Sequence, residues 1–230
     1  TAGVDPGYPL REGLEAILLV EMEGETEAEV AAALERVRTG VAGLAAHVSL
    51  ATEPERQASF WHVRKAASPL IAQRSDGRVS MQFIEDGVVP VARLADYIRA
   101  LRRVLGEYGV PAVIFGHAGD GNLHVNPLVP VYEPEWQRTI ESILWEIARE
   151  VHALGGTMSG EHGDGRLRAP LLETIWGAAM VARFGAVKDA FDPERILNPG
   201  VILPLPGQQP LEALRDYATS PPPAGAAALD

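Results

Sequence analysis

The sequence predicts an α+β fold: a ferredoxin-like antiparallel sheet covered by helices, with a C-terminal helical extension. Three observations predict it. Strand-like and helix-like segments alternate along the chain. Two apolar strand segments, residues 112–117 and 122–128, are separated by an Asp-Gly pair that is typical of a tight hairpin, which makes them antiparallel neighbours. The length of 230 residues and the hydrophobic content of 47% allow a sizeable core.

The first half of the chain contains two expected strands on either side of a helix. Residues 16–23 pass from an apolar run into alternation, and residues 46–51 also have a strand pattern. Between them, Thr26 and Glu29 have the spacing of a capping box, and apolar residues then recur at helical spacing. The other elements expected here are a helix over residues 53–67 and a strand over residues 78–84.

Helices flank the predicted hairpin in the second half of the chain. One is expected from near Pro90 to Gly109, and a long amphipathic helix over residues 134–154. Asp192 and Pro193 have the residue types of a helix N-cap and first position, so a short helix is expected to start there. We divide the chain into an N-terminal connection, one domain, and a Pro/Ala-rich tail or linker, at residues 1–14, 15–205 and 206–230.

Composition excludes several classes of function. The 31 acidic and 20 basic residues give a net charge of −11, which repels phosphate backbones, so we expect no nucleic-acid partner. No apolar run approaches the ~20 residues that span a bilayer, so we expect no membrane-spanning segment. The absence of cysteine excludes disulfides, thiolate metal sites and an iron–sulfur cluster held by this chain. The chain begins at Thr1 without a methionine or signal peptide, and we expect it to be a piece of a longer protein.

The hairpin brings polar side chains together. If Asp120 and Gly121 are the two turn residues, His117 faces His124 across the strands, with Cβ atoms about 4.5–5.5 Å apart. Asn126, two residues beyond His124, points to the same face. Two imidazoles at this separation are close enough to share a metal ion. Taken alone, however, the hairpin is more often an ordinary turn.

A glycine-spaced loop, residues 158–165, supplies what the hairpin lacks. Two histidines need a carboxylate to form a His₂Glu set with an open coordination position, and we assign Glu161 to that role. His162 is left free for proton transfer, because its ordinary pKa near ~6.5 suits a base at neutral pH. The other three histidines lie in strand or helix patterns and are expected to have no such role: His47, His62 and His152.

Three motifs in this order resemble a known family. They are Gly-His-Ala-Gly-Asp-Gly-Asn-Leu-His at 116–124, Ser-Gly-Glu-His-Gly-Asp-Gly at 159–165, and Asp-Pro-Glu-Arg-Ile-Leu-Asn-Pro-Gly at 192–200. The sequence from about residue 15 to 205 is similar to the C-terminal, substrate-side domain of FAD-linked oxidases. That family belongs to the vanillyl-alcohol oxidase superfamily and includes D-lactate dehydrogenases, the glycolate oxidase flavin subunit and D-2-hydroxyglutarate dehydrogenases.

The resemblance implies roles for the motif residues. His117, His124 and Glu161 would hold a divalent metal, zinc or manganese, that grips a 2-hydroxy acid. His162 would take the hydroxyl proton while the hydride leaves for FAD. Asn126 would hydrogen-bond substrate oxygens.

Further positions follow from the same resemblance. Residues 61–68 are similar to the family's Trp-x-x-Arg segment, so Arg64 is the candidate carboxylate clamp and Ser68 its hydroxyl neighbour. Asn198 is a candidate FAD neighbour. Relatives that prefer 2-hydroxyglutarate place a lysine where this chain has Ile84, so the contact to a second substrate carboxylate is open. Two arginines after the glycine-spaced loop could replace that lysine: Arg166 and Arg168.

We therefore expect the substrate- and metal-binding domain of an FAD-dependent D-2-hydroxyacid dehydrogenase of the D-lactate, D-2-hydroxyglutarate or glycolate class. FAD would be bound mainly by an upstream FAD-binding domain, and the isolated chain would be inactive. An iron–sulfur domain or subunit is a further expected partner, and the expected location is the cytoplasm, either free or peripheral to the inner membrane. Two alternatives stay open: a non-redox metal-binding or regulatory α+β module, and a His₂Glu zinc hydrolase.

Overall fold

The computed structural model of the chain describes residues 14–72 and 78–214. Contacts divide the chain into two compact units, Thr1–Ile71 and Ala72–Asp230, and each is described by itself. The domain boundaries expected from the sequence stay predictions, because residues 1–13 and 215–230 lie outside the described residues.

The first unit contains two helices, α1 (Glu27–Val41) and α2 (Pro54–Ala72). The predicted start of α1 is confirmed: the Thr26 side chain accepts a hydrogen bond from the Glu29 N–H. In a capping box the Glu29 carboxylate would accept from the N–H of the N-cap residue Thr26. Here it accepts from the N–H of the preceding residue, Glu25, at 3.0 Å. Helix α2 continues five residues beyond its expected end.

Two strands expected in this unit are not formed. Residues 16–23 and 46–51 have no strand hydrogen bonds, and Ile17 and Leu18 remain 56% and 68% exposed. A strand needs a neighbour to pair its N–H and C=O groups, and neither segment pairs with another segment within the described residues. Local alternation therefore gave the wrong prediction here.

The second unit is built around strand β4 (Asn122–Val129), which is the hub of a small antiparallel sheet. Strand β3 (Ala112–His117) pairs with β4 along one edge. On the opposite edge, β2 (Gly87–Val88) pairs with the start of β4 and β1 (Val79–Ser80) with its end. The predicted hairpin strands and the α+β class are confirmed, whereas the expected strand over 78–84 is reduced to its first residues.

The chain between β1 and β2 leaves the sheet because its side chains are needed elsewhere. Phe83 and Ile84 are fully buried in the core. Asp86 then adopts a left-handed backbone conformation, with φ of 73°, before β2 returns to β4. This turn brings two consecutive acidic residues, Glu85 and Asp86, to the sheet.

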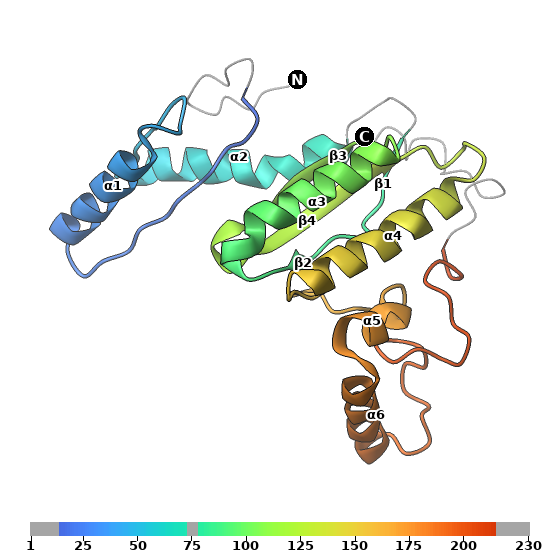
Figure 1. Cartoon of the computed structure of the whole chain (residues 1–230). Helices are drawn as coiled ribbons and strands as arrows, with labels where there is room; N and C mark the ends of the chain where they lie inside the picture. The colour runs from blue at the N-terminus through green and yellow to red at the C-terminus, as the bar shows by residue number, and fades with distance from the viewer. Residues whose placement is uncertain (1–13, 73–77, 215–230) are drawn as a thin grey trace. The chain divides into compact units, whose positions relative to one another are not determined.

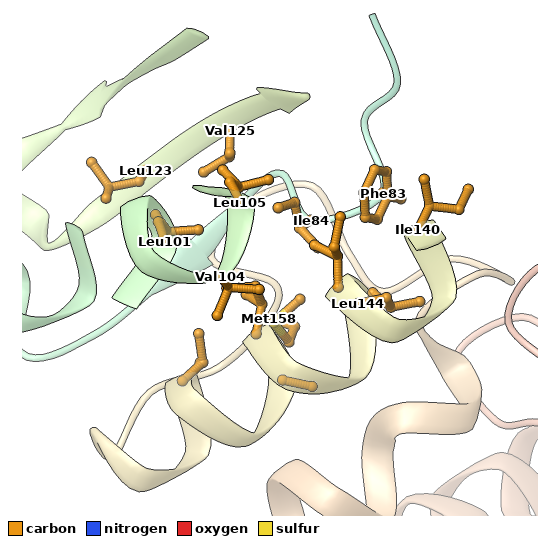
Figure 2. Close-up of a cluster of buried hydrophobic side chains, with 14 of the residues drawn as sticks. Phe83, Ile84, Leu101, Val104, Leu105, Leu123, Val125, Ile140, Leu144 and Met158 are labelled. Carbon is orange, nitrogen blue, oxygen red and sulfur yellow. The ribbon is translucent and has the colours of Figure 1, made fainter. Parts of the chain in front are cut away.

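Two amphipathic helices form the core with one face of the sheet. Helices α3 (Leu94–Glu107) and α4 (Trp136–Ala153) contact each other and lie on the same side of the strands (Figure 1). Figure 2 shows Leu123 and Val125 of β4 pointing toward Leu101 and Leu105 of α3. The remaining labelled members of this cluster come from the β1–β2 segment, α3, α4 and the chain after α4: Phe83, Ile84, Val104, Ile140, Leu144 and Met158.

Helices α5 (Leu172–Trp176) and α6 (Ala178–Phe191) follow, in agreement with the expected C-terminal extension. The short helix expected at Asp192 is wrong. Asp192 instead ends α6, and its carboxylate accepts from the N–H groups of Ile196 and Leu197, which stabilises a turn. Gln208, which we placed in the tail, is buried and donates to the carbonyls of Arg166 and Gly200.

Candidate metal and proton-transfer site

The candidate site lies on the face of β4 that points away from α3 and α4. Side chains alternate along a strand, so Leu123 and Val125 point to the core and Asn122, His124 and Asn126 point to the other face. All five are buried. Three polar side chains in alternation on a buried strand need polar partners on that face.

The hairpin register differs by two residues from the prediction. His117 pairs with Asn122 and not with His124, because Ala118–Asp120 form a turn of 3-10 helix and Gly121 alone adopts the left-handed conformation. A shift of two residues keeps every side chain on its predicted face, since the side-chain period of a strand is two. His117 and His124 are therefore diagonal neighbours, with ring centroids 5.4 Å apart in an edge-to-face arrangement.

Glu161 joins these histidines from the loop after α4. Its Oε1 atom lies 3.1 Å from His124 Nε2 and 3.6 Å from His117 Nε2. One ligand atom from each residue lies within 4.8 Å of the other two. Gly160 allows the loop to approach the sheet, because a Cβ there would lie 2.7 Å from Asn122 Nδ2. The structure thus brings together the three predicted metal ligands.

The donor set fits a divalent transition metal. Two imidazole nitrogens and one carboxylate oxygen are the ligands of catalytic His₂Glu zinc sites, and they also suit manganese. The side chains of His117 and Glu161 are 49% and 50% exposed, so further coordination positions are accessible to water or a substrate. His124 is buried, and its Nδ1 lacks a hydrogen-bond partner within the described structure.

His162 stands beside this cluster. Its ring stacks on His124 at 5.1 Å between centroids, and its Nε2 lies 3.6 Å from Glu161 Oε1. Its Nδ1 lies 2.8 Å from the Glu85 carboxylate. The hydrogen bond to Glu85 raises the pKa of His162, and the negative charges of Glu85, Asp86 and Glu161 add to that effect against a smaller desolvation.

Asp86 was missed as a site residue, and it holds the loop that carries Glu161 and His162. Its fully buried carboxylate accepts from the N–H groups of Glu161 and His162, from the Ser159 hydroxyl and from the Asn122 amide. Burial alone would raise the pKa of Asp86, but these four donors hold it below its ordinary value. The sequence signal that could have identified Asp86 is the acidic pair Glu85–Asp86 directly after the apolar residues Phe83 and Ile84.

Arg168 is not free to replace the missing lysine. It is buried and donates to the Glu85 and Gly163 carbonyls, and its Nη1 lies 3.3 Å from Glu85 Oε1. These internal contacts use both terminal nitrogens of the guanidinium. Arg166 is exposed and stays a candidate for the contact to a second substrate carboxylate.

The remaining predicted residues lie in different places. Asn126 is on the site face, where its Oδ1 accepts from Gln82 Nε2 at 3.3 Å and its buried Nδ2 has no partner within the described residues. Asn198 is exposed in a turn, with φ of 44°. Arg64 and Ser68 are in α2 of the first unit, and the side chain of Ser68 lies outside the described part of the structure. Their roles stay predictions.

The sequence of the chain is similar to those of known proteins. Residues 4–202 match the family described as FAD linked oxidases, C-terminal domain. Glycolate oxidase subunit GlcD of Bacillus subtilis (strain 168) is 32% identical over 186 residues, which are 80% of this chain and 38% of that protein. Glycolate oxidase subunit GlcD of Escherichia coli (strain K12) is 34% identical over 204 residues, which are 87% of this chain and 39% of that protein.

A third relative has a different substrate in its name. D-2-hydroxyglutarate dehydrogenase of Escherichia coli (strain K12) is 34% identical over 148 residues, which are 64% of this chain and 14% of that protein. The chain therefore spans about two fifths of the glycolate oxidase subunits and much less of this dehydrogenase. Among the described residues, no helix is long and apolar enough to cross a lipid bilayer.

Proposed function

Because the chain belongs to the FAD-linked oxidase C-terminal domain family, we propose that it is the substrate- and metal-binding domain of an FAD-dependent D-2-hydroxyacid dehydrogenase. The observation that carries the proposal is the convergence of His117, His124 and Glu161, with His162 beside them. The relatives are named for glycolate, D-2-hydroxyglutarate and D-lactate, which share a 2-hydroxy carboxylate. That shared group is the proposed substrate class.

The proposed reaction oxidises the substrate hydroxyl to a carbonyl. His117, His124 and Glu161 would hold zinc or manganese, with room left for substrate oxygens. Such a metal would supply Lewis-acid polarisation of the substrate hydroxyl, and FAD would supply the hydride acceptor. His162 accepts the hydroxyl proton at Nε2, the nitrogen that faces Glu161. The substrate loses one proton and one hydride in total and leaves as a 2-oxo acid.

Other residues of this chain would orient the substrate. The buried Nδ2 of Asn126 is a donor without a protein acceptor among the described residues, which supports a hydrogen bond to a substrate oxygen. Arg64, with Ser68 beside it in the sequence, is the proposed carboxylate clamp, because a guanidinium matches a carboxylate in geometry and charge. We keep Asn198 as a proposed FAD neighbour.

The proposed partners are a 2-hydroxy acid, an FAD-binding domain outside this chain and an iron–sulfur domain or subunit as electron acceptor. The relatives are longer than this chain, which is consistent with further domains in the whole protein. A cytoplasmic location belongs to the same proposal.

Calorimetric titration of the chain with Zn²⁺ and Mn²⁺ tests the metal site. We expect stoichiometric binding that is lost in His124→Ala and Glu161→Gln. His47→Ala is the matched control, because His47 is exposed and its Nε2 lies 2.8 Å from the hydroxyl of its near neighbour Ser49. If His124→Ala binds as much metal as wild type, the proposed metal site is wrong.

Turnover tests the reaction class. The protein that includes an FAD-binding domain should reduce a dye acceptor with D-lactate, D-2-hydroxyglutarate or glycolate. His162→Ala should lower kcat by a factor of about 100 or more, because general-base catalysis contributes that much. Metal binding without turnover of any of the three acids would favour a non-redox module, and ester or amide hydrolysis would favour a hydrolase.

A further inference from the structure

The Glu85 carboxylate lies between two cationic or protonated side chains. Its Oε2 is 2.8 Å from His162 Nδ1, and its Oε1 is 3.3 Å from Arg168 Nη1. Arg168 is fixed in turn, because it also donates to the carbonyls of Glu85 and Gly163. The Glu85 side chain is only 12% exposed, so water competes weakly for these contacts.

The contact with Glu85 determines which nitrogen of His162 carries a proton. A carboxylate that faces a guanidinium on its other oxygen has only acceptors to offer, so the hydrogen bond requires a proton on Nδ1. In the neutral ring, Nε2 then has a free lone pair. The Nε2 atom lies on the side of Glu161, at 3.6 Å from its Oε1, where the proposed substrate would bind.

We propose that Glu85, anchored by Arg168, is a positioning residue that fixes His162 in the Nδ1–H tautomer and keeps Nε2 available as the base. The role of the base rests on the function proposed above. The tautomer and its dependence on Glu85 do not, because they follow from contacts within this chain. A carboxylate behind a catalytic histidine has this general effect, since it selects both the tautomer and the ring orientation.

The same atoms could instead hold a second cation, since Glu85, His124 and His162 each offer a ligand atom within 4.8 Å of the others. Three observations favour the positioning role. The Glu85–His162 distance of 2.8 Å is already a hydrogen bond, His124 Nδ1 is farther away at 3.7 Å, and the Arg168 guanidinium at Glu85 would repel a dication.

Glu85→Gln gives a sharp test because an amide cannot accept on both sides. If its oxygen faces Arg168, its NH₂ faces His162 and requires an unprotonated Nδ1. We therefore expect the proton to move from Nδ1 to Nε2. Long-range ¹H–¹⁵N spectra of the metal-free full chain, recorded at a pH high enough that the His162 signals no longer change, distinguish the two neutral tautomers. His162→Gln assigns the signal.

Three outcomes decide the proposal. It is supported if wild-type His162 is the Nδ1–H tautomer and Glu85→Gln reverses it, while Glu150→Gln leaves it unchanged. Glu150 is the matched control because it also pairs with an arginine, Arg103, at 2.6 Å, but belongs to α4. An Nε2–H tautomer in the wild-type chain overturns the proposal without any variant, and so does an unchanged tautomer in Glu85→Gln.

Zinc titration separates this proposal from the function on which it depends. Glu85→Gln should bind zinc with the same stoichiometry as wild type, and loss of a second equivalent would show a cation site and overturn the positioning role. Absence of zinc binding in the wild type would overturn the proposed function and leave the tautomer result standing. In the flavin-loaded enzyme, Glu85→Gln should lower kcat by a factor of about 100 with KM little changed.

Discussion

At the scale of single residues, the buried carboxylate of Asp86 holds the loop that carries Glu161 and His162. Four donors converge on it, and two of them are the backbone N–H groups of Glu161 and His162. These hydrogen bonds fix the backbone of Glu161 and His162, and with it the positions of their Cα and Cβ atoms. The loop therefore depends on a residue that lies more than 70 positions away in the sequence.

Asp86→Asn should destabilise the protein by about 1–3 kcal/mol, because the amide NH₂ would face donors that then lack an acceptor. Urea unfolding followed by circular dichroism measures the change. Asp120→Asn is the control, since Asp120 is exposed in the turn between β3 and β4, and it should shift the free energy of unfolding by less than about 0.5 kcal/mol. Equal stabilities of the two variants would contradict the role of Asp86.

Asp192 makes part of the stability depend on pH. The hydrogen bond from Lys188 lowers the pKa of Asp192, and the N–H groups of Leu197 and Ile196 add to this against desolvation. A lowered pKa means that the unfolded chain binds the proton more tightly. The stabilisation is therefore fully present above the ordinary aspartate pKa near ~3.9 and is lost as the pH falls through the lowered value.

Thermal unfolding of wild type and Asp192→Asn should consequently differ most near neutral pH. The two midpoints should converge as the pH falls from about 5 to about 2, because the wild-type carboxyl then becomes neutral as well. A midpoint difference that stays constant across this range would show that the charge of Asp192 is not the source of the stabilisation.

At the scale of elements, local signals predicted what local interactions form. The capping residue Thr26, the helical apolar stripes and the hairpin strands are all encoded within a few neighbouring residues, and the structure has them. Strand pairing over long distances is different. Residues 16–23 have a strand pattern but no partner within the described chain, and β2 consists of two residues that no alternation reveals.

The candidate site shows the same division. His117, His124, Glu161 and His162 were predicted because glycine-rich segments mark them. The hairpin register was wrong by two residues, yet His117 and His124 still share a face because a shift of two preserves it, and their role as metal ligands stays a prediction. Glu85 has no such marker, since its partners His162 and Arg168 are brought to it only by the folded sheet.

The two faces of the sheet should respond separately to mutation. Leu144 of α4 is fully buried in the helix-side core, so Leu144→Ala should cost about 2–5 kcal/mol of stability. Zinc affinity, measured well below the unfolding midpoint, should remain near wild type because the proposed ligands lie on or beside the opposite face of the sheet. Leu44→Ala is the matched control, since Leu44 is 89% exposed and its loss should be nearly neutral. Weaker zinc binding in folded Leu144→Ala would contradict this separation.

At the scale of the whole molecule, the net charge of −11 complicates every metal experiment. An acidic chain attracts any dication nonspecifically. The bound cations screen the repulsion among its negative charges, which stabilises the folded chain slightly. The proposed site differs from this background in its chemistry. Imidazole nitrogens favour zinc over calcium, which prefers oxygen ligands, so the choice of ion separates the two effects.

Zinc should therefore stabilise the folded chain by linkage. At a free concentration of 100 times Kd, one site adds about 2.7 kcal/mol to the free energy of unfolding, provided that the unfolded chain does not bind. Unfolding in urea with zinc, with calcium and with chelator measures this increment at constant ionic strength. His117→Ala combined with His124→Ala should remove the zinc increment and leave the smaller calcium effect unchanged, because the net charge is the same. If the double variant keeps the zinc increment, the stabilisation comes from the acidic surface, and the convergence of His117, His124 and Glu161 does not bind metal.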